Sequence, residues 1–338
     1  MCLADFHLFY NAMLKPSQVM VSILAGINAG LILMLCIISF SGICHAQDDT
    51  IRVDTNLVTV RVAVKDRDGR YVTNLKREDF RIFENGTEQE IPYFQPTEQY
   101  FTVFLLLDVS DSMTYELQNM IKAANTFFER LRPEDRLIAA TFDSRVNTYI
   151  NNKTVKEIRE TRTKAQFFAG PTLPDTMVYD AIDHAMDKMK KIRGRKAVVL
   201  YSDGIGSGYR NSAESTLREA EEQEATIYTL RYDTKAPPGY VMGEKEAARR
   251  KGRTETAKRY MRELAEVTGG RYFPMEAISN LEEAFSRIAE ELSQQYSLAY
   301  YPKEPGKKGE RREINVKVNI PDAAVQARSS YIVGSTKK

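Results

Sequence analysis

Cysteine and histidine are scarce in this sequence, and tryptophan is absent. All three cysteines precede residue 45, so the rest of the chain has no disulfide framework, no thiolate zinc site and no cysteine nucleophile. Two of the three histidines precede residue 46, which leaves His184 as the one histidine of the main body. We expect this helical side chain to be solvated or packed, so a serine or cysteine hydrolase triad lacks its usual base.

The sequence also lacks a strong excess of charge of either sign. Its 338 residues are 43% hydrophobic and 28% charged, which is an ordinary globular composition with room for more than one domain. The formal net charge is only +2, so the charge balance gives no indication of a nucleic-acid partner.

A long hydrophobic run occurs only near the beginning of the chain. Residues 19–43 are almost all apolar and lead to a small-residue site at Ala46. This pattern is typical of a secretory signal over residues 1–46, cut after Ala46, with translation starting at Met1 or Met13. The run is also long enough to span a bilayer, so an uncleaved membrane anchor is the alternative. In both cases the protein is exported to the periplasm, the cell envelope or the medium.

The stretch Phe101–Asp108 is apolar until its last residue and predicts a buried central strand of a parallel sheet. Asp108, Ser110 and Ser112 follow at the carboxyl end of this strand, where open α/β sheets place their ligand sites. A carboxylate and two hydroxyls suit a hard cation such as Mg²⁺ or Mn²⁺. The alternative is that one of the serines only caps the following helix.

Two distant segments also carry an oxygen-bearing side chain at the end of a predicted strand or the start of a predicted helix. Residues 197–202 predict a second apolar strand, which ends at Asp203 and Gly204, and Thr176 opens an amphipathic helix over 177–192. In this order, the three segments resemble the von Willebrand factor A family and its metal-ion-dependent adhesion site. The resemblance implies a Mg²⁺ or Mn²⁺ site formed by Asp108, Ser110, Ser112, Thr176 and Asp203.

One departure from the family pattern concerns the threonine. Glycines usually precede it, whereas Pro174 and Asp175 precede Thr176 here. Thr172 is therefore an alternative ligand. We favour Thr176, because the Tyr-Asp-Ala-Ile sequence that begins at Tyr179 is also typical of the family.

The chain is expected to contain a doubly wound, mostly parallel α/β domain over residues 100–295, since strands alternate with helices there. Residues 47–99 and 296–338 predict short alternating strands and turns on either side. We interpret these flanks as two halves of one β-sandwich into which the α/β domain is inserted, because the ends of a domain usually lie close together. This predicted arrangement resembles that of secreted acidobacterial proteins with an A domain. Two unrelated β flanks are the alternative.

The resemblance implies a binding module and no enzyme. In the family's scheme, the hydroxyls coordinate the cation directly and the two aspartates act largely through water. The cation then accepts an acidic residue of a protein partner. One alternative is an envelope scaffold without metal-dependent binding. Another is a Mg²⁺-dependent phosphatase, which would need a second aspartate at position 110, where the chain has Ser110.

The stretch 234–257 follows the predicted strand 225–232 and is rich in Arg and Lys. We expect a long loop at the same edge of the sheet as Asp108 and Asp203, either mobile or functional. Its basic residues would favour an acidic partner surface.

Overall fold

The computed structural model describes residues 57–96, 99–161, 176–234, 241–275 and 280–334. The leader, with its predicted cleavage site, and Thr172 lie outside these ranges. Within them, no helix combines the length and the apolar character that crossing a membrane requires.

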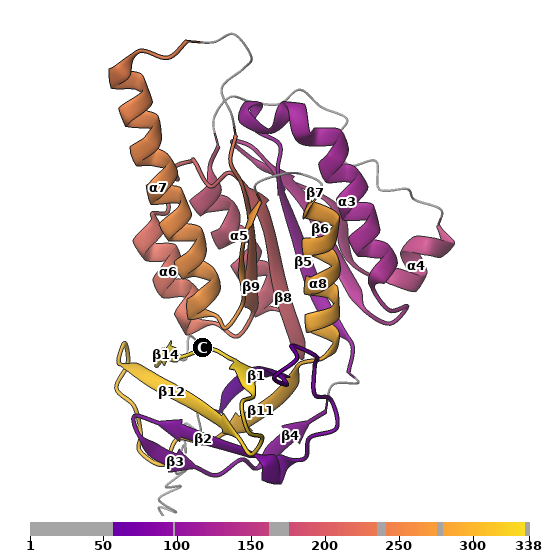
Figure 1. Cartoon of the computed structure of the whole chain (residues 1–338), viewed down its shortest axis with the longest axis vertical. Coiled ribbons are helices and arrows are strands. Elements are labelled where there is room, and N and C mark those ends of the chain that lie inside the picture. Colours follow the sequence, from indigo (N-terminus) through magenta and orange to yellow (C-terminus); the bar gives the residue numbers. More distant parts are fainter. Residues whose placement is uncertain (1–56, 97–98, 162–175, 235–240, 276–279, 335–338) are drawn as a thin grey trace, which may run out of the picture. The chain divides into compact units, whose positions relative to one another are not determined.

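A six-stranded sheet in the order β10-β9-β8-β5-β6-β7 forms the centre of the α/β domain (Figure 1). Its strands are β5 (Phe101–Asp108), β6 (Arg136–Phe142), β7 (Val146–Thr154), β8 (Arg195–Ser202), β9 (Thr226–Tyr232) and β10 (Tyr272–Met275). All neighbouring strands are parallel except β6 and β7. Every residue of β5 is buried, because the strand is paired on both edges and covered on both faces.

Helices cover both faces of this sheet, as the sequence predicts for a doubly wound domain. One face packs against η2 (Asp111–Glu116), α3 (Leu117–Arg130), α4 (Val155–Glu160) and α8 (Leu281–Ser293). The other face packs against α5 (Val178–Lys190), α6 (Ala213–Glu222) and α7 (Glu244–Val267). In α3, α5 and α8 the apolar residues recur at helical spacing and form one buried stripe, which fixes the face that meets the sheet.

Two further sheets, in the orders β13-β1-β11-β4 and β14-β12-β2-β3, form a β-sandwich. The elements that precede the central domain are β1 (Val58–Lys65), η1 (Arg77–Asp79), β2 (Phe80–Glu84), β3 (Thr87–Gln89) and β4 (Tyr93–Gln95). Those that follow it are β11 (Tyr296–Tyr300), β12 (Arg311–Val318), β13 (Ala324–Gln326) and β14 (Ser330–Ile332). Strand β1 pairs with β11 and β2 pairs with β12, so each sheet combines both ends of the chain. The predicted composite sandwich is confirmed.

Two parts of the central domain differ from the sequence prediction. Helix α6 was not expected, because its buried residues are small or polar and give little apolar periodicity. The predicted loop over 234–257 is wrong from Glu244 onward, where α7 begins. This part of α7 is rich in Glu, Lys, Arg and Ala, which favour a helix, yet it buries no residue before Ala257 and shows no apolar stripe.

Candidate functional site

The candidate site begins where β5 ends. Asp108 is fully buried, and its Oδ1 accepts hydrogen bonds from the Ser110 N–H at 3.0 Å and from the Ser110 Oγ at 2.6 Å. The Ser110 Oγ also lies 3.2 Å from the Ser112 Oγ. Ser112 in turn hydrogen-bonds the carboxylate of Asp203. Four of the five predicted metal ligands therefore form one continuous chain of side-chain contacts across the ends of β5 and β8.

The end of β8, the loop after it and the segment after β9 hold the two carboxylates from the other side. The Ser202 Oγ donates a hydrogen bond to Asp108 Oδ2 and accepts one from the Gly204 N–H at 2.8 Å. Asp203 Oδ1 accepts the Ile205 N–H at 2.8 Å, and Asp203 Oδ2 accepts the Thr234 hydroxyl at 3.1 Å. Each carboxylate is thus fixed in orientation by groups on its own strand end and on neighbouring elements.

Thr176 is placed by its backbone. Its carbonyl accepts the Ser207 N–H at 2.9 Å, which joins it to the loop after β8. The next residue, Met177, donates its N–H to the Asp143 carbonyl at 2.9 Å, which joins it to the loop after β6. Strands β8 and β6 are the two neighbours of β5 in the sheet, so the segment 176–177 crosses the carboxyl end of β5. Thr176, itself buried, therefore lies at the same end of the sheet as Asp108.

Asp180, in the first turn of α5, organises the loop that continues from Asp203. Its carboxylate accepts the backbone N–H groups of Tyr209, Arg210 and Asn211 at 2.6 to 3.1 Å. Burial alone would raise the pKa of Asp180, but these hydrogen bonds outweigh it and the pKa is lowered. The carboxylate is therefore ionised at neutral pH and holds the loop against the start of α5.

The two aspartates of the site repel each other in a buried environment. Burial raises the pKa of Asp108 to about 7, and the carboxylate of Asp203 adds to this increase. Burial likewise raises the pKa of Asp203. A cation placed between these carboxylates would favour their ionised forms, because an opposite charge stabilises an acid's anion.

The donor chemistry fits a hard divalent cation. The side chains brought together are carboxylates and hydroxyls, the oxygen ligands that Mg²⁺ and Mn²⁺ prefer. The described ranges contain no group of three or more His, Cys, Asp and Glu side chains that could hold a metal ion. A cation here would therefore depend on the hydroxyls of Ser110, Ser112 and Thr176 as well as on the carboxylates.

A family model of the von Willebrand factor type A domain matches residues 102–287, more than half of the chain. The chain belongs to this family. Its von Willebrand factor type A (VWA) domain is the central α/β domain described above, and the matched residues run from β5 into α8. A comparison with curated protein sequences finds no match.

Several solved structures are similar to this chain. A von Willebrand factor type A structure from Catenulispora acidiphila is 10% identical to this chain, with a TM-score of 0.44. The match covers 76% of this chain and 74% of the other. The open pilus adhesin SpaC from Lactobacillus rhamnosus GG is 8% identical, with coverages of 76% and 48% and a TM-score of 0.45. The vWF domain of the pilus tip protein Mfa5 from Porphyromonas gingivalis is 13% identical, with coverages of 56% and 94% and a TM-score of 0.42.

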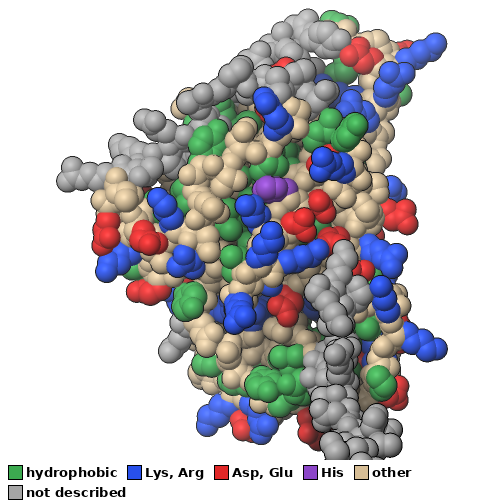
Figure 2. Space-filling view, turned by 180° about the vertical axis from the view of Figure 1, so that it is seen from behind, with side chains coloured by type: hydrophobic (Ala, Val, Ile, Leu, Met, Phe, Trp, Pro, Cys, Tyr) green, Lys and Arg blue, Asp and Glu red, His purple; other side chains and the backbone are tan. Residues whose placement is uncertain are grey.

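His184 lies on α5, within the VWA domain and away from the chain of contacts at the sheet's end. It is half-buried, and burial together with the nearby Lys188 lowers its pKa. Figure 2 shows the histidine on the outer face of the molecule, where Lys and Arg side chains are interspersed with Asp and Glu. These surroundings match the solvated or packed helical histidine that the sequence predicts.

Sequence reasoning missed the supporting roles of three residues. Ser202 and Thr234 hydrogen-bond the two aspartates, and Asp180 holds the loop beyond Asp203. The signal for Ser202 was a hydroxyl at the end of an otherwise apolar strand, directly before Asp203. No local pattern singles out Thr234, whose role depends on the path of the chain after β9.

Proposed function

We propose that this protein is an exported binding module that uses a divalent cation to grip an acidic residue of a protein partner. The cation, Mg²⁺ or Mn²⁺, would be held by the two carboxylates and three hydroxyls of the site: Asp108, Ser110, Ser112, Thr176 and Asp203. The observation that supports this most directly is the chain of contacts from Asp108 through Ser110 and Ser112 to Asp203. It gathers hard oxygen donors from two strand ends at one point.

The protein's own groups would determine how the cation acts. Three of the five donors are neutral hydroxyls, so the bound cation would keep part of its positive charge and could accept a carboxylate from outside. Asp108 and Asp203 are each restrained by at least two hydrogen bonds, which hold the two mutually repelling carboxylates in place. The partner is thus expected to supply the remaining anionic ligand.

A phosphatase is the weaker candidate. Its nucleophile would be Asp108, which is fully buried and hydrogen-bonded by Ser110 and Ser202. The position that should carry the acid/base carboxylate is Ser110, whose hydroxyl donates to Asp108 instead. These contacts favour a binding role without catalysis.

The proposal includes export, and the support for it comes from the sequence. The apolar run over 19–43 and the small-residue site at Ala46 are typical of a leader that directs a chain out of the cytoplasm. Cell envelope, periplasm and medium are the locations consistent with this leader. Sequencing the amino terminus of the protein from envelope and culture fractions distinguishes cleavage after Ala46 from an uncleaved anchor.

Calorimetric titration of the purified protein with Mg²⁺ and Mn²⁺ tests the cation. We expect saturable binding to the wild type and no binding to the Asp108→Asn variant, while both proteins give the same circular dichroism spectrum. Retention by the wild type of envelope proteins in Mg²⁺, and their release by a chelator, would extend the result to the partner. Equal cation binding by wild type and variant would contradict the proposal, and so would metal-independent retention.

A further inference from the structure

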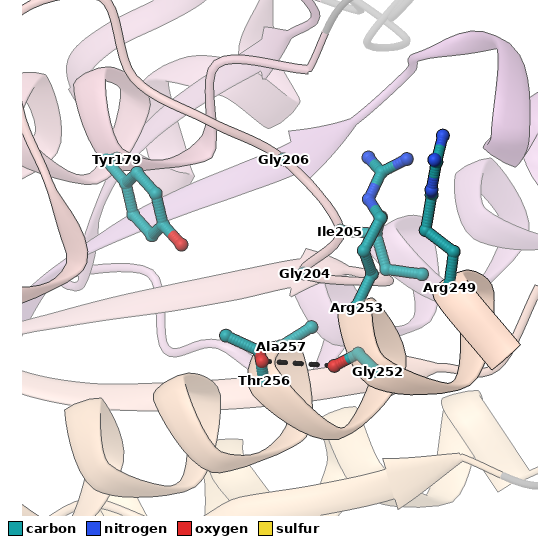
Figure 3. A pocket seen from close by; sticks show the side chains of 9 residues that line it. All are labelled: Tyr179, Gly204, Ile205, Gly206, Arg249, Gly252, Arg253, Thr256 and Ala257. Atoms are coloured by element: carbon teal, nitrogen blue, oxygen red, sulfur yellow. Dashed lines mark hydrogen bonds between the residues drawn. The ribbon is translucent and has the colours of Figure 1, made fainter.

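A cavity of about 340 Å³ lies beside the candidate metal site, between the loop 204–206 and α7 (Figure 3). The α7 side of the cavity carries Arg249, Gly252 and Arg253, and Tyr179 of α5 contributes a hydroxyl that points into it. Among the residues that the structure describes, no Asp or Glu lines this cavity. The lining thus provides cationic and hydrogen-bonding groups without a balancing acid.

Arg249 and Arg253 are four positions apart, which places them on one side of the helix. Both are exposed, and their guanidinium groups extend from α7 in the same direction (Figure 3). Within the described ranges neither has an ion-pair partner, whereas Arg250 between them donates to the Thr234 carbonyl. Like charges at this spacing weaken a helix slightly, so the pair does not serve the helix itself.

Gly252 adds a second, independent observation. A glycine inside a helix costs about 1 kcal/mol relative to alanine. Packing does not require it, because a Cβ at this position would have no atom within 4 Å. By contrast, Gly204 across the cavity has a φ of +70° and no room for a side chain against Met261. Gly252 therefore leaves open space on the cavity wall beside both arginines, where another molecule can approach the helix closely.

The cavity and the metal site share the loop 204–206. Gly204 directly follows Asp203, and Gly206 packs against Thr176. The cavity therefore borders the metal site through this loop, and three residues of an extended peptide, about 10 Å, would span the loop itself. A carboxylate on the cation and a second one on the arginines would then be only a few residues apart in the partner.

We propose that Arg249 and Arg253 form an anion site for a second carboxylate of the same acidic polypeptide. Only the first carboxylate, which binds the cation, rests on the proposed function; the anion site for the second carboxylate does not. Guanidinium groups bind carboxylates through paired, charge-assisted hydrogen bonds, and two of them in a row along a helix match an extended acidic segment. The cation then supplies attraction to any carboxylate, and the arginines select partners whose acidic residues are correctly spaced.

Two synthetic peptides test this assignment by fluorescence anisotropy at low salt with saturating Mg²⁺. One peptide carries two aspartates separated by two glycines, and in the other the second aspartate is asparagine. The wild type should bind the first peptide about tenfold more tightly. This preference should disappear in the Arg249→Gln/Arg253→Gln variant and persist in Lys245→Gln/Lys251→Gln, which removes the same charge from the same helix outside the cavity. An unchanged preference in the first variant, or an equal loss in the second, would overturn the assignment.

Two further measurements separate this inference from the metal proposal. The arginine variant should retain the full Mg²⁺-induced rise in melting temperature, and its loss would show that the variant damages the metal site instead. In chelator, the one-aspartate peptide at high concentration should shift the NMR signals of the Arg249 and Arg253 Nε–H groups, even if Mg²⁺ binding fails altogether. Absence of these shifts refutes the anion site, and shifts with inorganic phosphate alone would assign it to phosphate instead of a polypeptide.

Discussion

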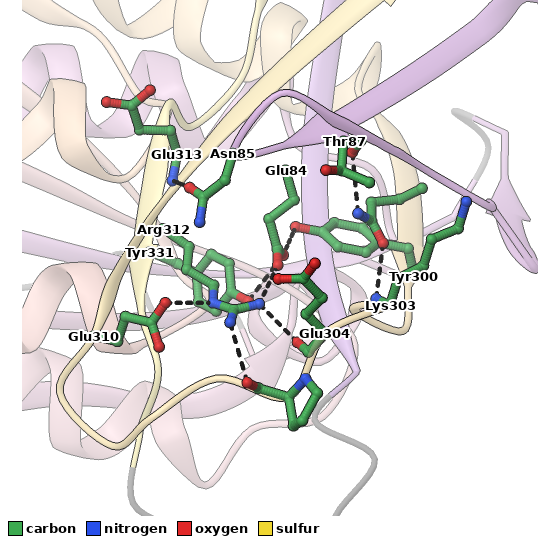
Figure 4. A network of polar contacts seen from close by, with 12 residues as sticks. Glu84, Asn85, Thr87, Tyr300, Lys303, Glu304, Glu310, Arg312, Glu313 and Tyr331 are labelled. Carbon is green, nitrogen blue, oxygen red and sulfur yellow. Dashed lines mark hydrogen bonds and ion pairs between the residues drawn. The ribbon is translucent and has the colours of Figure 1, made fainter.

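Glu84 and Arg312 form an ion pair inside the β-sandwich, although 228 positions separate them in the chain (Figure 4). Their side chains are only 3% and 5% exposed. The Glu84 carboxylate also accepts the hydroxyls of Tyr300 at 2.6 Å and Tyr331 at 2.9 Å. One acid before the VWA domain is thus satisfied entirely by residues that follow it, and the two ends of the chain depend on each other.

Replacing Arg312 by alanine should destabilise the protein strongly. The change leaves a buried carboxylate without its cation, which typically costs about 3 to 5 kcal/mol. Denaturant unfolding measures the effect, and Arg81→Ala is the matched control because the Arg81–Glu88 pair is exposed. If both variants lose the same stability, the buried pair does not hold the sandwich together.

Mg²⁺ should raise the melting temperature of the wild type, because a ligand that binds only the folded state stabilises it by about 2.7 kcal/mol at a hundredfold excess over Kd. Ser112→Ala and Thr176→Ala should each reduce this response, since each removes a neutral oxygen donor. Ser144→Ala removes a hydroxyl from the loop after β6 and serves as the control. A full Mg²⁺ response in Thr176→Ala, together with a loss in Thr172→Ala, would assign the site to Thr172.

The stability of the metal-free protein should fall as pH rises from about 4 to about 7. Burial and the carboxylate of Asp203 raise the pKa of Asp108 from 3.8 in the unfolded chain to about 7 in the folded protein, so the unfolded chain loses this proton first as pH rises. The stability that the protonated acid contributes is therefore complete below the unfolded pKa of 3.8 and is lost as pH rises through the folded pKa of about 7. The stabilisation by Mg²⁺ should grow over the same range, because the cation binds the ionised form. Thermal unfolding at several pH values, with and without Mg²⁺, measures both trends, and Asp108→Asn should flatten them.

Asp180→Asn should loosen the loop beyond Asp203 without unfolding the VWA domain. The neutral amide is a weaker acceptor for the N–H groups of Tyr209, Arg210 and Asn211. Their hydrogen exchange should accelerate about tenfold, the change expected for a loss of about 1.4 kcal/mol. Exchange in β5 should remain as in the wild type, and acceleration throughout the domain would show a global effect instead.

The sequence predicted the α/β architecture because its strands are short apolar runs with polar ends. The run Phe101–Asp108 shows this pattern in isolation, as does 197–203. The composite sandwich was also predictable from alternating strands on both sides. Its locking group was not, since nothing near Glu84 indicates that Tyr300, Arg312 and Tyr331 would surround it.

The residues of the candidate site occur in short motifs, and the structure brings Asp108, Ser110, Ser112 and Asp203 into one chain of contacts. That they bind a cation stays a prediction. The arginine cavity is only partly predictable: the sequence shows the basic stretch and predicts a loop, whereas most of this stretch is helical. Helical spacing is what puts Arg249 and Arg253 on one side, and an irregular loop would not have fixed this relation.

The pairing of β1 with β11 determines how the molecule would carry a mechanical load. In their antiparallel register Val58 lies opposite Tyr300, and Val62 lies opposite Tyr296, the residue at which the chain enters β11 from the VWA domain. A pull between the amino-terminal end of β1 and the VWA domain therefore acts on opposite ends of this strand pair. The force runs along the strands and perpendicular to their hydrogen bonds, so the bonds are loaded together in shear and are not unzipped one at a time.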